Sequence, residues 1–110
     1  MGDRPFLGEF EHLVLAAVMR LEQPYGAALI EEIEERTGRR VPVGSLYVTL
    51  DRLERKGFVT SSLEGPERKR GGRPKRFIDA TPAGVRILGA HREALLRMWD
   101  GLESRLERGR

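Results

Sequence analysis

The order of local patterns along this chain constrains its fold more than any other feature of the sequence. Residues 10–21, 26–38 and 42–57 carry apolar side chains at the three- and four-residue spacing of amphipathic helices. Prolines and glycines mark the boundaries of these stretches: Pro24, Gly26, Gly38, Pro42 and Gly57. Residues 58–63 and 76–80 are then rich in β-branched and aromatic residues, which predicts an antiparallel hairpin.

Three helices followed by a hairpin is the order of a winged helix-turn-helix, whose third helix enters the DNA major groove. The inward stripe of that helix is expected to be Leu46, Leu50 and Leu53. Small polar side chains near its N-terminus allow close approach to base edges, and basic ones suit phosphates. We therefore predict groove contacts by Ser45, Thr49 and Arg52 and a DNA-backbone contact by Lys56. The alternative for Ser45 and Thr49 is an ordinary helix surface.

The segment between the two predicted strands is a loop of glycine, proline and charge. Residues 68–76 hold six positive charges in nine positions, and clustered Arg and Lys are the electrostatic footprint of nucleic-acid binding. Arginines on so thin an element suit the enhanced negative potential of a narrow minor groove. The alternative is a solvated charged loop. We predict that the loop contacts DNA through five side chains: Arg68, Lys69, Arg70, Arg73 and Lys75.

A long last helix is expected over residues 82–108, because Thr81 and Pro82 suit its N-cap and first position. Its apolar residues follow heptad-like steps, with Val85 at the start of the stripe. A chain of 110 residues has little core left to cover such a helix. We therefore predict a homodimer that buries Leu88, Leu95, Trp99, Leu102 and Leu106.

The predicted fold is mainly α with a small β-hairpin, divided into two parts. Residues 1–81 are expected to form the winged helix-turn-helix DNA-binding domain and residues 82–110 the dimerisation helix. The net charge of +3 is unevenly distributed between them: residues 1–38 carry −5, residues 39–81 carry +6, and residues 82–110 carry +2. The basic middle contains both the third helix and the hairpin, which favours double-stranded DNA as the partner.

Several motifs at fixed spacing resemble those of the PadR-like family of transcriptional regulators. They are Gly44-Ser45-Leu46-Tyr47 with Leu50, Arg52-Leu53-Glu54 and Gly57, the opening Leu7-Gly8, Glu11 and Val14-Leu15, the corner Tyr25-Gly26, and Gly72-Arg73-Pro74 before Thr81 and Gly84. The resemblance covers about residues 7–84. It implies a cytoplasmic bacterial regulator, in most members a dimeric repressor, of the short type with one C-terminal dimerisation helix.

The same resemblance implies that Tyr47 contacts the DNA backbone; the alternative is a packed ring with its hydroxyl at the surface. Two residues depart from the family pattern. Val48 stands where the family usually has proline, and Ile78 where an aromatic residue is common. Neither change removes a hydrogen-bond donor, so both bear on the target sequence rather than on DNA binding.

Trp99 is the only tryptophan and has two interpretations. The first is packing in the dimer interface, where tryptophan is enriched. The second is a binding site for an aromatic small-molecule effector near the two-fold axis, to which Met98 adds adaptable apolar surface. Some short PadR-like regulators are sensors of drugs or metabolites, so the resemblance is compatible with an inducer.

No pattern of a catalytic or metal site is found. The four glutamates of the second helix have no nucleophile beside them, which favours a solvated helix face over acid–base chemistry: Glu31, Glu32, Glu34 and Glu35. His12 and His91 lie far apart in sequence and in no H-x-x-x-H pattern, so we expect surface or interface residues rather than ligands. We expect no enzyme activity, cofactor or metal.

The absence of cysteine fits a cytoplasmic protein, and the longest apolar run, residues 13–19, is too short to span a bilayer. The acidic start of the chain is unlike a signal peptide. We therefore expect no membrane partner.

Two other functions stay open at this point, because a fold does not fix a function. One is a winged-helix adaptor that binds proteins, and the other is a non-specific architectural protein that uses the loop in the minor groove. The basic loop favours DNA binding over the adaptor.

Overall fold

Three short helices come first in the structure, a computed structural model that describes residues 6–64 and 75–109. Helix α1 spans Glu9–Arg20, α2 spans Gly26–Thr37 and α3 spans Val43–Arg55. The predicted stops at Gly38 and Gly57 are confirmed, and both glycines have the positive φ of a helix C-terminus. The three apolar stripes meet in one core together with residues of the hairpin.

Strands β1 (Val59–Glu64) and β2 (Lys75–Ala80) form the predicted antiparallel hairpin. A contact that the sequence did not indicate anchors the middle of β2. The corner before α2 pairs with the other edge of β2, where Tyr25 forms a bridge with Phe77 and the Ile78 amide donates to the Pro24 carbonyl at 2.9 Å. The arrangement is the winged helix-turn-helix that the sequence predicts, with the hairpin fixed to the start of α2.

The core is made almost entirely of aliphatic side chains contributed by every one of these elements. Its largest fully buried members are Val14, Leu15, Leu29, Leu46, Leu50, Leu53, Val59 and Ile78. Burial of each such side chain stabilises the fold by roughly 1.5–3 kcal/mol relative to exposure. The aliphatic residue at position 78, which departs from the family pattern, is thus a core residue of the hairpin.

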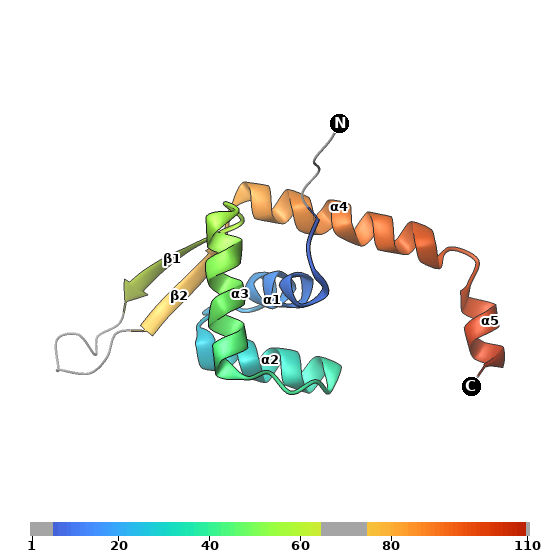
Figure 1. The fold of residues 1–110 in the computed structure, drawn as a ribbon, viewed down its shortest axis with the longest axis horizontal. Coiled ribbons are helices and arrows are strands. Elements are labelled where there is room, and N and C mark those ends of the chain that lie inside the picture. Colours follow the sequence, from blue (N-terminus) through green and yellow to red (C-terminus); the bar gives the residue numbers. More distant parts are fainter. Residues whose placement is uncertain (1–5, 65–74, 110) are drawn as a thin grey trace.

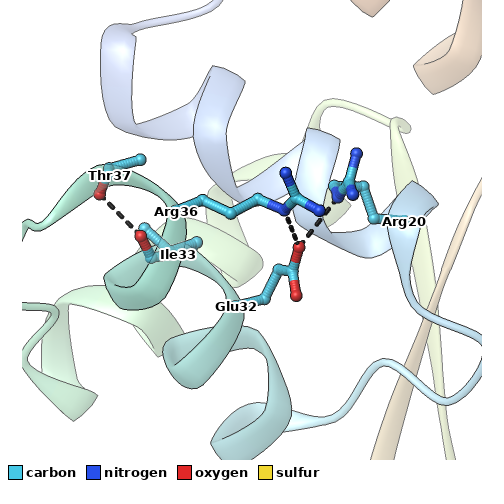
Figure 2. Close-up of polar contacts among 5 residues, drawn as sticks. All are labelled: Arg20, Glu32, Ile33, Arg36 and Thr37. Carbon is cyan, nitrogen blue, oxygen red and sulfur yellow. Dashed lines mark hydrogen bonds and ion pairs between the residues drawn. The ribbon is translucent and has the colours of Figure 1, made fainter.

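A polar cluster at the edge of the core links α1 to α2 (Figure 2). Arg20 of α1 and Arg36 of α2 both donate from Nε to the same carboxylate oxygen of Glu32, the former at 2.9 Å. The hydrogen bonds from Arg36 and then from Arg20 hold the pKa of Glu32 below its ordinary value. In the next turn the Thr37 hydroxyl donates to the Ile33 carbonyl at 2.7 Å, which caps the end of α2. These contacts account for part of the acidic helix face and give it a structural role.

Helix α4 spans Pro82–Trp99 and begins as predicted, with the Thr81 hydroxyl accepting from the Gly84 amide at 3.0 Å. The same hydroxyl donates to the Gly57 carbonyl at 2.7 Å, so one side chain ties the helix start to the end of α3. Gly84 lies directly against the backbone of Phe58, the residue before β1. A Cβ at position 84 would be 2.1 Å from the Phe58 carbonyl oxygen, so only glycine allows this packing.

The prediction of one continuous helix over residues 82–108 is wrong. Helix α4 ends at Trp99, and a separate helix α5 (Glu103–Arg108) follows. The break lies at Asp100 and Gly101, where Gly101 has φ +85°. A left-handed residue ends an α-helix, and glycine adopts this conformation without a steric penalty. The heptad-like stripe continues across the break because its last two members, Leu102 and Leu106, repeat the same spacing.

The C-terminal part forms an arm that extends away from the domain (Figure 1). The hairpin projects on one side, while α4 passes over α1 and continues beyond it to α5. The radius of gyration is 16.4 Å, compared with about 13 Å for a compact domain of this length. No helix in the described part of the chain is long and apolar enough to cross a membrane.

Candidate nucleic-acid interface

The outer face of α3 is the surface that its buried leucines leave exposed. Leu46, Leu50 and Leu53 are fully buried, and the opposite side of the helix carries Ser45, Val48 and Arg52 at the surface. These three side chains line a shallow open hollow that also includes Gly44 and Phe10 of α1. Among the described residues, Arg52 has no hydrogen-bond or ion-pair partner. Ser45 and Arg52 are therefore exposed on the outer face of α3, and their contacts with DNA stay predictions.

Val48 occupies the middle of this face. At 100° per residue, it lies about opposite the line of Leu46, Leu50 and Leu53, and more than half of its surface is exposed. An apolar side chain at this position can contact a thymine methyl group but donates no hydrogen bond. The face thus combines one apolar centre with the polar side chains of Ser45 and Arg52.

The prediction that Thr49 contacts the groove disagrees with the structure. Its side chain is only 5% exposed and lies on the core side of the helix, at the floor of the hollow. The helical spacing explains this position, because Thr49 comes three residues after Leu46 and four before Leu53. A side chain so covered cannot reach a base edge, so Thr49 is removed from the set of contact residues.

The DNA-backbone contact of Lys56 stays a prediction, and the structure gives this lysine a partner within its own chain. The Lys56 ammonium donates to both carboxylate oxygens of Glu11 in α1, at 3.1 and 2.9 Å. Glu11 is buried, and its Oε1 also accepts from the Gly8 amide at 2.8 Å. Lys56 therefore neutralises a buried carboxylate and joins the end of α3 to the start of α1. Its ammonium is already engaged by a charge from the protein itself.

Burial and hydrogen bonding act in opposite directions on Glu11. Burial alone raises the pKa of this carboxyl, but the Gly8 amide, Lys56 and the charge of Arg52 together lower the pKa below its ordinary value. Glu11 is thus ionised at neutral pH despite its burial, and this ionised form depends on Lys56.

The Tyr47 ring is packed against its own chain more closely than the family resemblance implies. Its hydroxyl lies over the first residue of α2, so that a Cβ at position 26 would be 2.2 Å from the hydroxyl oxygen. The ring is still about one-third exposed, and the guanidinium carbon of Arg76 lies 5.9 Å from its centroid. The structure therefore brings the Tyr47 hydroxyl to the N-terminal end of α2. The hydroxyl hydrogen and the N-terminus of α2 both carry partial positive charge. This position therefore suits a hydrogen bond from the Tyr47 hydroxyl to a phosphate.

The start of β2, at the loop end of the described hairpin, is tied to α3 by charge. Arg76 of β2 donates to Asp51 at 3.2 Å and to Glu54 at 3.0 Å, both on α3. The neighbouring Lys75 places its ammonium 4.3 Å from the centroid of the Tyr25 ring. The sequence analysis missed the Arg76 contact. Two acidic residues, at 51 and 54, on a helix predicted to face DNA were the available signal, because acidic side chains there need a basic partner. Lys75 is exposed at the edge of the interface.

Four of the predicted loop contacts lie outside the described residues: Arg68, Lys69, Arg70 and Arg73. Lys75 is the predicted loop cation that the structure describes, and it lies at the hairpin end from which the loop begins.

The arm exposes a continuous set of large apolar side chains. About half of Trp99 and three-quarters of Met98 are exposed to solvent, and the predicted interface residues Leu95, Leu102 and Leu106 are exposed to a similar extent as Trp99. The sequence analysis missed one member of the same surface, Leu96. We call this set, Leu95, Leu96, Met98, Trp99, Leu102 and Leu106, the arm face.

Leu88 does not belong to the arm face. It is partly buried and packs with Ile87 and Ala83 against the core of its own chain. One side of the first two turns of α4 thus packs against the winged helix, while Val85 in the first turn is exposed like the residues of the arm face. That Leu88 also contributes to a dimer interface stays a prediction.

The two histidines, which the sequence separates by 79 residues, meet where α4 passes over α1. The Nδ1 atoms of His12 and His91 are 2.7 Å apart. In the described part of the chain no group of three or more potential ligands is placed to hold a metal ion. The pair belongs to the contact between the domain and the arm.

Comparison with known proteins identifies relatives of the whole arrangement. The chain matches the family described as "Transcriptional regulator PadR-like family" over residues 14–90. The transcriptional regulator Rv3488 of Mycobacterium tuberculosis is 44% identical over 71 residues, which are 64% of this chain and 62% of that protein. The match thus spans less than two-thirds of the relative's length.

Solved structures share the fold. A PadR family transcription regulator of Clostridium difficile R20291 has a TM-score of 0.75 at 20% identity, over 90% of this chain and 99% of that one. A PadR family transcriptional regulator of Eggerthella lenta has a TM-score of 0.69 at 25% identity, over 90% and 87% of the two chains. The coverage includes the arm as well as the winged helix.

Proposed function

The chain belongs to the PadR-like family of transcriptional regulators, and on this premise we propose that it is a homodimeric repressor that binds a specific sequence in double-stranded DNA. In this proposal the protein acts in the cytoplasm, where it binds the DNA. In this proposal residues 1–81 bind DNA and residues 82–110 hold the two chains together, although the first turns of α4 also complete the core of the DNA-binding part.

The observation that carries the proposal is the outer face of α3. The helix is held by three fully buried leucines, and its far side presents Ser45, Val48 and Arg52 to solvent beside the hairpin. A helix that fits the major groove needs small side chains near its N-terminus and a basic one to fix its position. Gly44 and Ser45 supply the first requirement and Arg52 the second.

The hairpin and the start of α2 extend the same surface. Lys75, the Tyr47 hydroxyl and the N-terminus of α2 all lie at its edge and suit contacts with phosphates. We include in the same proposal the loop cations Arg68, Lys69, Arg70 and Arg73, because they lie between β1 and β2 in the sequence and carry positive charge. Base contacts by α3 then supply specificity, and the cations supply salt-dependent affinity.

The arm face supports the dimer. All six side chains of the arm face are exposed, on a segment that extends beyond the core of its own chain. Contiguous apolar surface of this kind marks an interaction site, and a second copy related by a two-fold axis buries it on both sides. Two copies of α3 would then face successive major grooves, with half-sites about one turn, ~10 bp, apart.

A small-molecule effector acts on the arm in this proposal. Trp99 and Met98 are the two members of the arm face best suited to an aromatic ligand, because a flat indole ring and a flexible thioether adapt to one. An aromatic effector bound between the two arms would change the angle between them. It would release DNA only if it bound the non-matching arrangement more tightly than the matching one.

Selection of duplexes from a random-sequence pool at near-physiological salt tests the proposal. A two-fold symmetric site supports the repressor, whereas enrichment of A·T content alone would indicate an architectural protein, and no enrichment an adaptor. Arg52→Ala should weaken binding to the selected site, whereas Arg97→Ala is the matched control. Arg97 is an exposed arginine in the last turn of α4, so the control removes the same charge away from α3.

A further inference from the structure

His12 of α1 and His91 of α4 form a polar side-chain contact between the domain and the arm. The Nδ1 atoms are 2.7 Å apart, the ring centroids 4.9 Å, and the ring planes are tilted by 50°. Both rings are half-buried. The ring centroids are almost as far apart as a distance of 2.7 Å between the two Nδ1 atoms permits. Each Nδ1 atom therefore points nearly at the other. This is the geometry of a hydrogen bond between imidazoles.

Such a bond fixes how many protons the pair can hold. One Nδ1 must carry a proton and donate it, while the other must be free to accept it. A first additional proton can bind at an Nε2 atom and leave the bond intact. A second additional proton must occupy the accepting Nδ1, which removes the bond and places two positive rings side by side. The contact therefore exists in the neutral and singly charged pair but not in the doubly charged pair.

The surrounding charges do not compensate a second positive ring. Several carboxylates on α1 and on the elements packed against it are engaged with basic side chains, in the pairs Glu9–Arg39, Glu11–Lys56, Glu32 with Arg20 and Arg36, and Asp51 and Glu54 with Arg76. On α4, Glu93 lies 3.7 Å from Arg92. The other charged side chains of these elements are exposed or bonded to backbone: Glu31, Glu34, Glu35, Arg52, Arg55, Lys75, Asp79, Arg86 and Arg97.

Burial lowers the pKa of His12, and the charge of His91 lowers it further. Both causes favour the neutral ring, which is the form that accepts the hydrogen bond.

We propose that the His12–His91 pair is a proton-operated latch that holds the arm on the DNA-binding domain at neutral pH and releases it under mildly acidic conditions. Its effect on DNA binding rests on the proposed function. Helix α4 carries the arm face, and α1 packs directly on α3. When the latch opens, the arm is free to change its angle to the domain, and the two α3 helices of a dimer no longer match successive grooves.

The latch itself can be tested without DNA, because these are the only two histidines of the chain. Their ring Cε1–H signals are followed by NMR between pH 8 and pH 4.5 in the wild-type protein, in His12→Gln and in His91→Gln. The wild-type pair should titrate in two steps at least one pH unit apart, a tenfold difference in proton affinity, with the second step below the single step of either variant. Two independent single steps, equal to those of the variants, would overturn the proposal.

Movement of the arm is measured in the same protein. Since the chain has no cysteine, spin labels can be attached at Met19→Cys on α1 and Arg97→Cys on α4, both exposed in the native chain, with labelled protein diluted into unlabelled protein. The distance distribution should broaden or shift as the second proton binds, and it should be independent of pH when His91→Gln is added. A distribution unchanged through both proton steps contradicts a latch.

Binding to a selected duplex closes the test. At constant salt, affinity for a site with both half-sites should fall at least tenfold in the wild-type protein as the second proton binds. A duplex with one half-site should lose less, and His91→Gln should remove the difference between the two duplexes. Equal losses on both duplexes would overturn the link to arm geometry. Absence of DNA binding at pH 7.5 would instead refute the proposed function and leave the NMR result to decide the latch.

Discussion

Replacing Lys56 by alanine separates the structural assignment of this lysine from a role in DNA contact. The variant leaves the Glu11 carboxylate buried, with the Gly8 amide as its remaining hydrogen-bond donor. Removing one partner of a fully buried ion pair destabilises a protein by about 3–5 kcal/mol. The Lys56 side chain is 36% exposed, so solvent screens part of the interaction and the expected loss is about 2 kcal/mol.

The loss should depend on pH in a definite direction. Because the folded-state pKa of Glu11 is lowered, its ionisation stabilises the wild-type fold above the ordinary carboxyl pKa, and this contribution disappears as the pH falls through the folded-state value. In Lys56→Ala, burial is opposed by fewer favourable contacts, so the pKa of Glu11 should rise. The stability difference between the two proteins should therefore be largest at neutral pH and shrink toward pH 4.

Urea unfolding at fixed protein concentration measures the loss, and Arg55→Ala is the matched control on the exposed side of α3. The double variant Glu11→Gln/Lys56→Met should recover most of the stability, because the amide can still accept from Gly8 and no charge is left buried. The salt dependence of DNA binding should be unchanged in Lys56→Ala. Unchanged stability together with a slope reduced by about one unit would refute the reasoning and restore the phosphate contact.

Three further substitutions test other parts of the structure. Gly84→Ala should destabilise the protein by about 3 kcal/mol in thermal unfolding, because the new Cβ would meet the Phe58 carbonyl. Gly89→Ala is the control in open space and should stabilise the protein by up to ~1 kcal/mol. Equal effects of the two substitutions would contradict the close approach at Gly84. Trp99→Glu should convert the dimer to a monomer in sedimentation, and a dimer of wild-type mass would rule out the arm face as the interface. Arg52→Ala should reduce the salt slope of DNA binding by about one unit, while a slope equal to that of Arg97→Ala would exclude a phosphate contact by Arg52.

The fold was predictable because its signals are local. Helix periodicity, the helix ends at Gly38 and Gly57 and the cap at Thr81 all act within a few residues of where they appear in the sequence. The break at Gly101 was missed because the heptad-like spacing continues through it and suggested one helix. A glycine next to aspartate was the available signal, since both are weak helix formers.

The candidate site was predictable only in part, because contacts between distant segments leave no local trace. Nothing near Lys56 in the sequence indicates Glu11, which is 45 residues away, and nothing near His12 indicates His91. Thr49 is a different case. Its spacing from Leu46 and Leu53 already places it on the buried side of α3. The helical geometry was therefore a better guide to this position than the suitability of a threonine side chain for base contact.

The central claim is that a dimer places two α3 helices in successive major grooves on one side of the DNA. Hydroxyl-radical footprinting on the duplex selected from a random pool, with the ratio of chains to duplex measured by sedimentation, tests it most directly. The claim predicts two chains per duplex and two protected stretches with centres about 10 bp apart, related by a two-fold axis. One chain per duplex, or a single protected stretch, would contradict it.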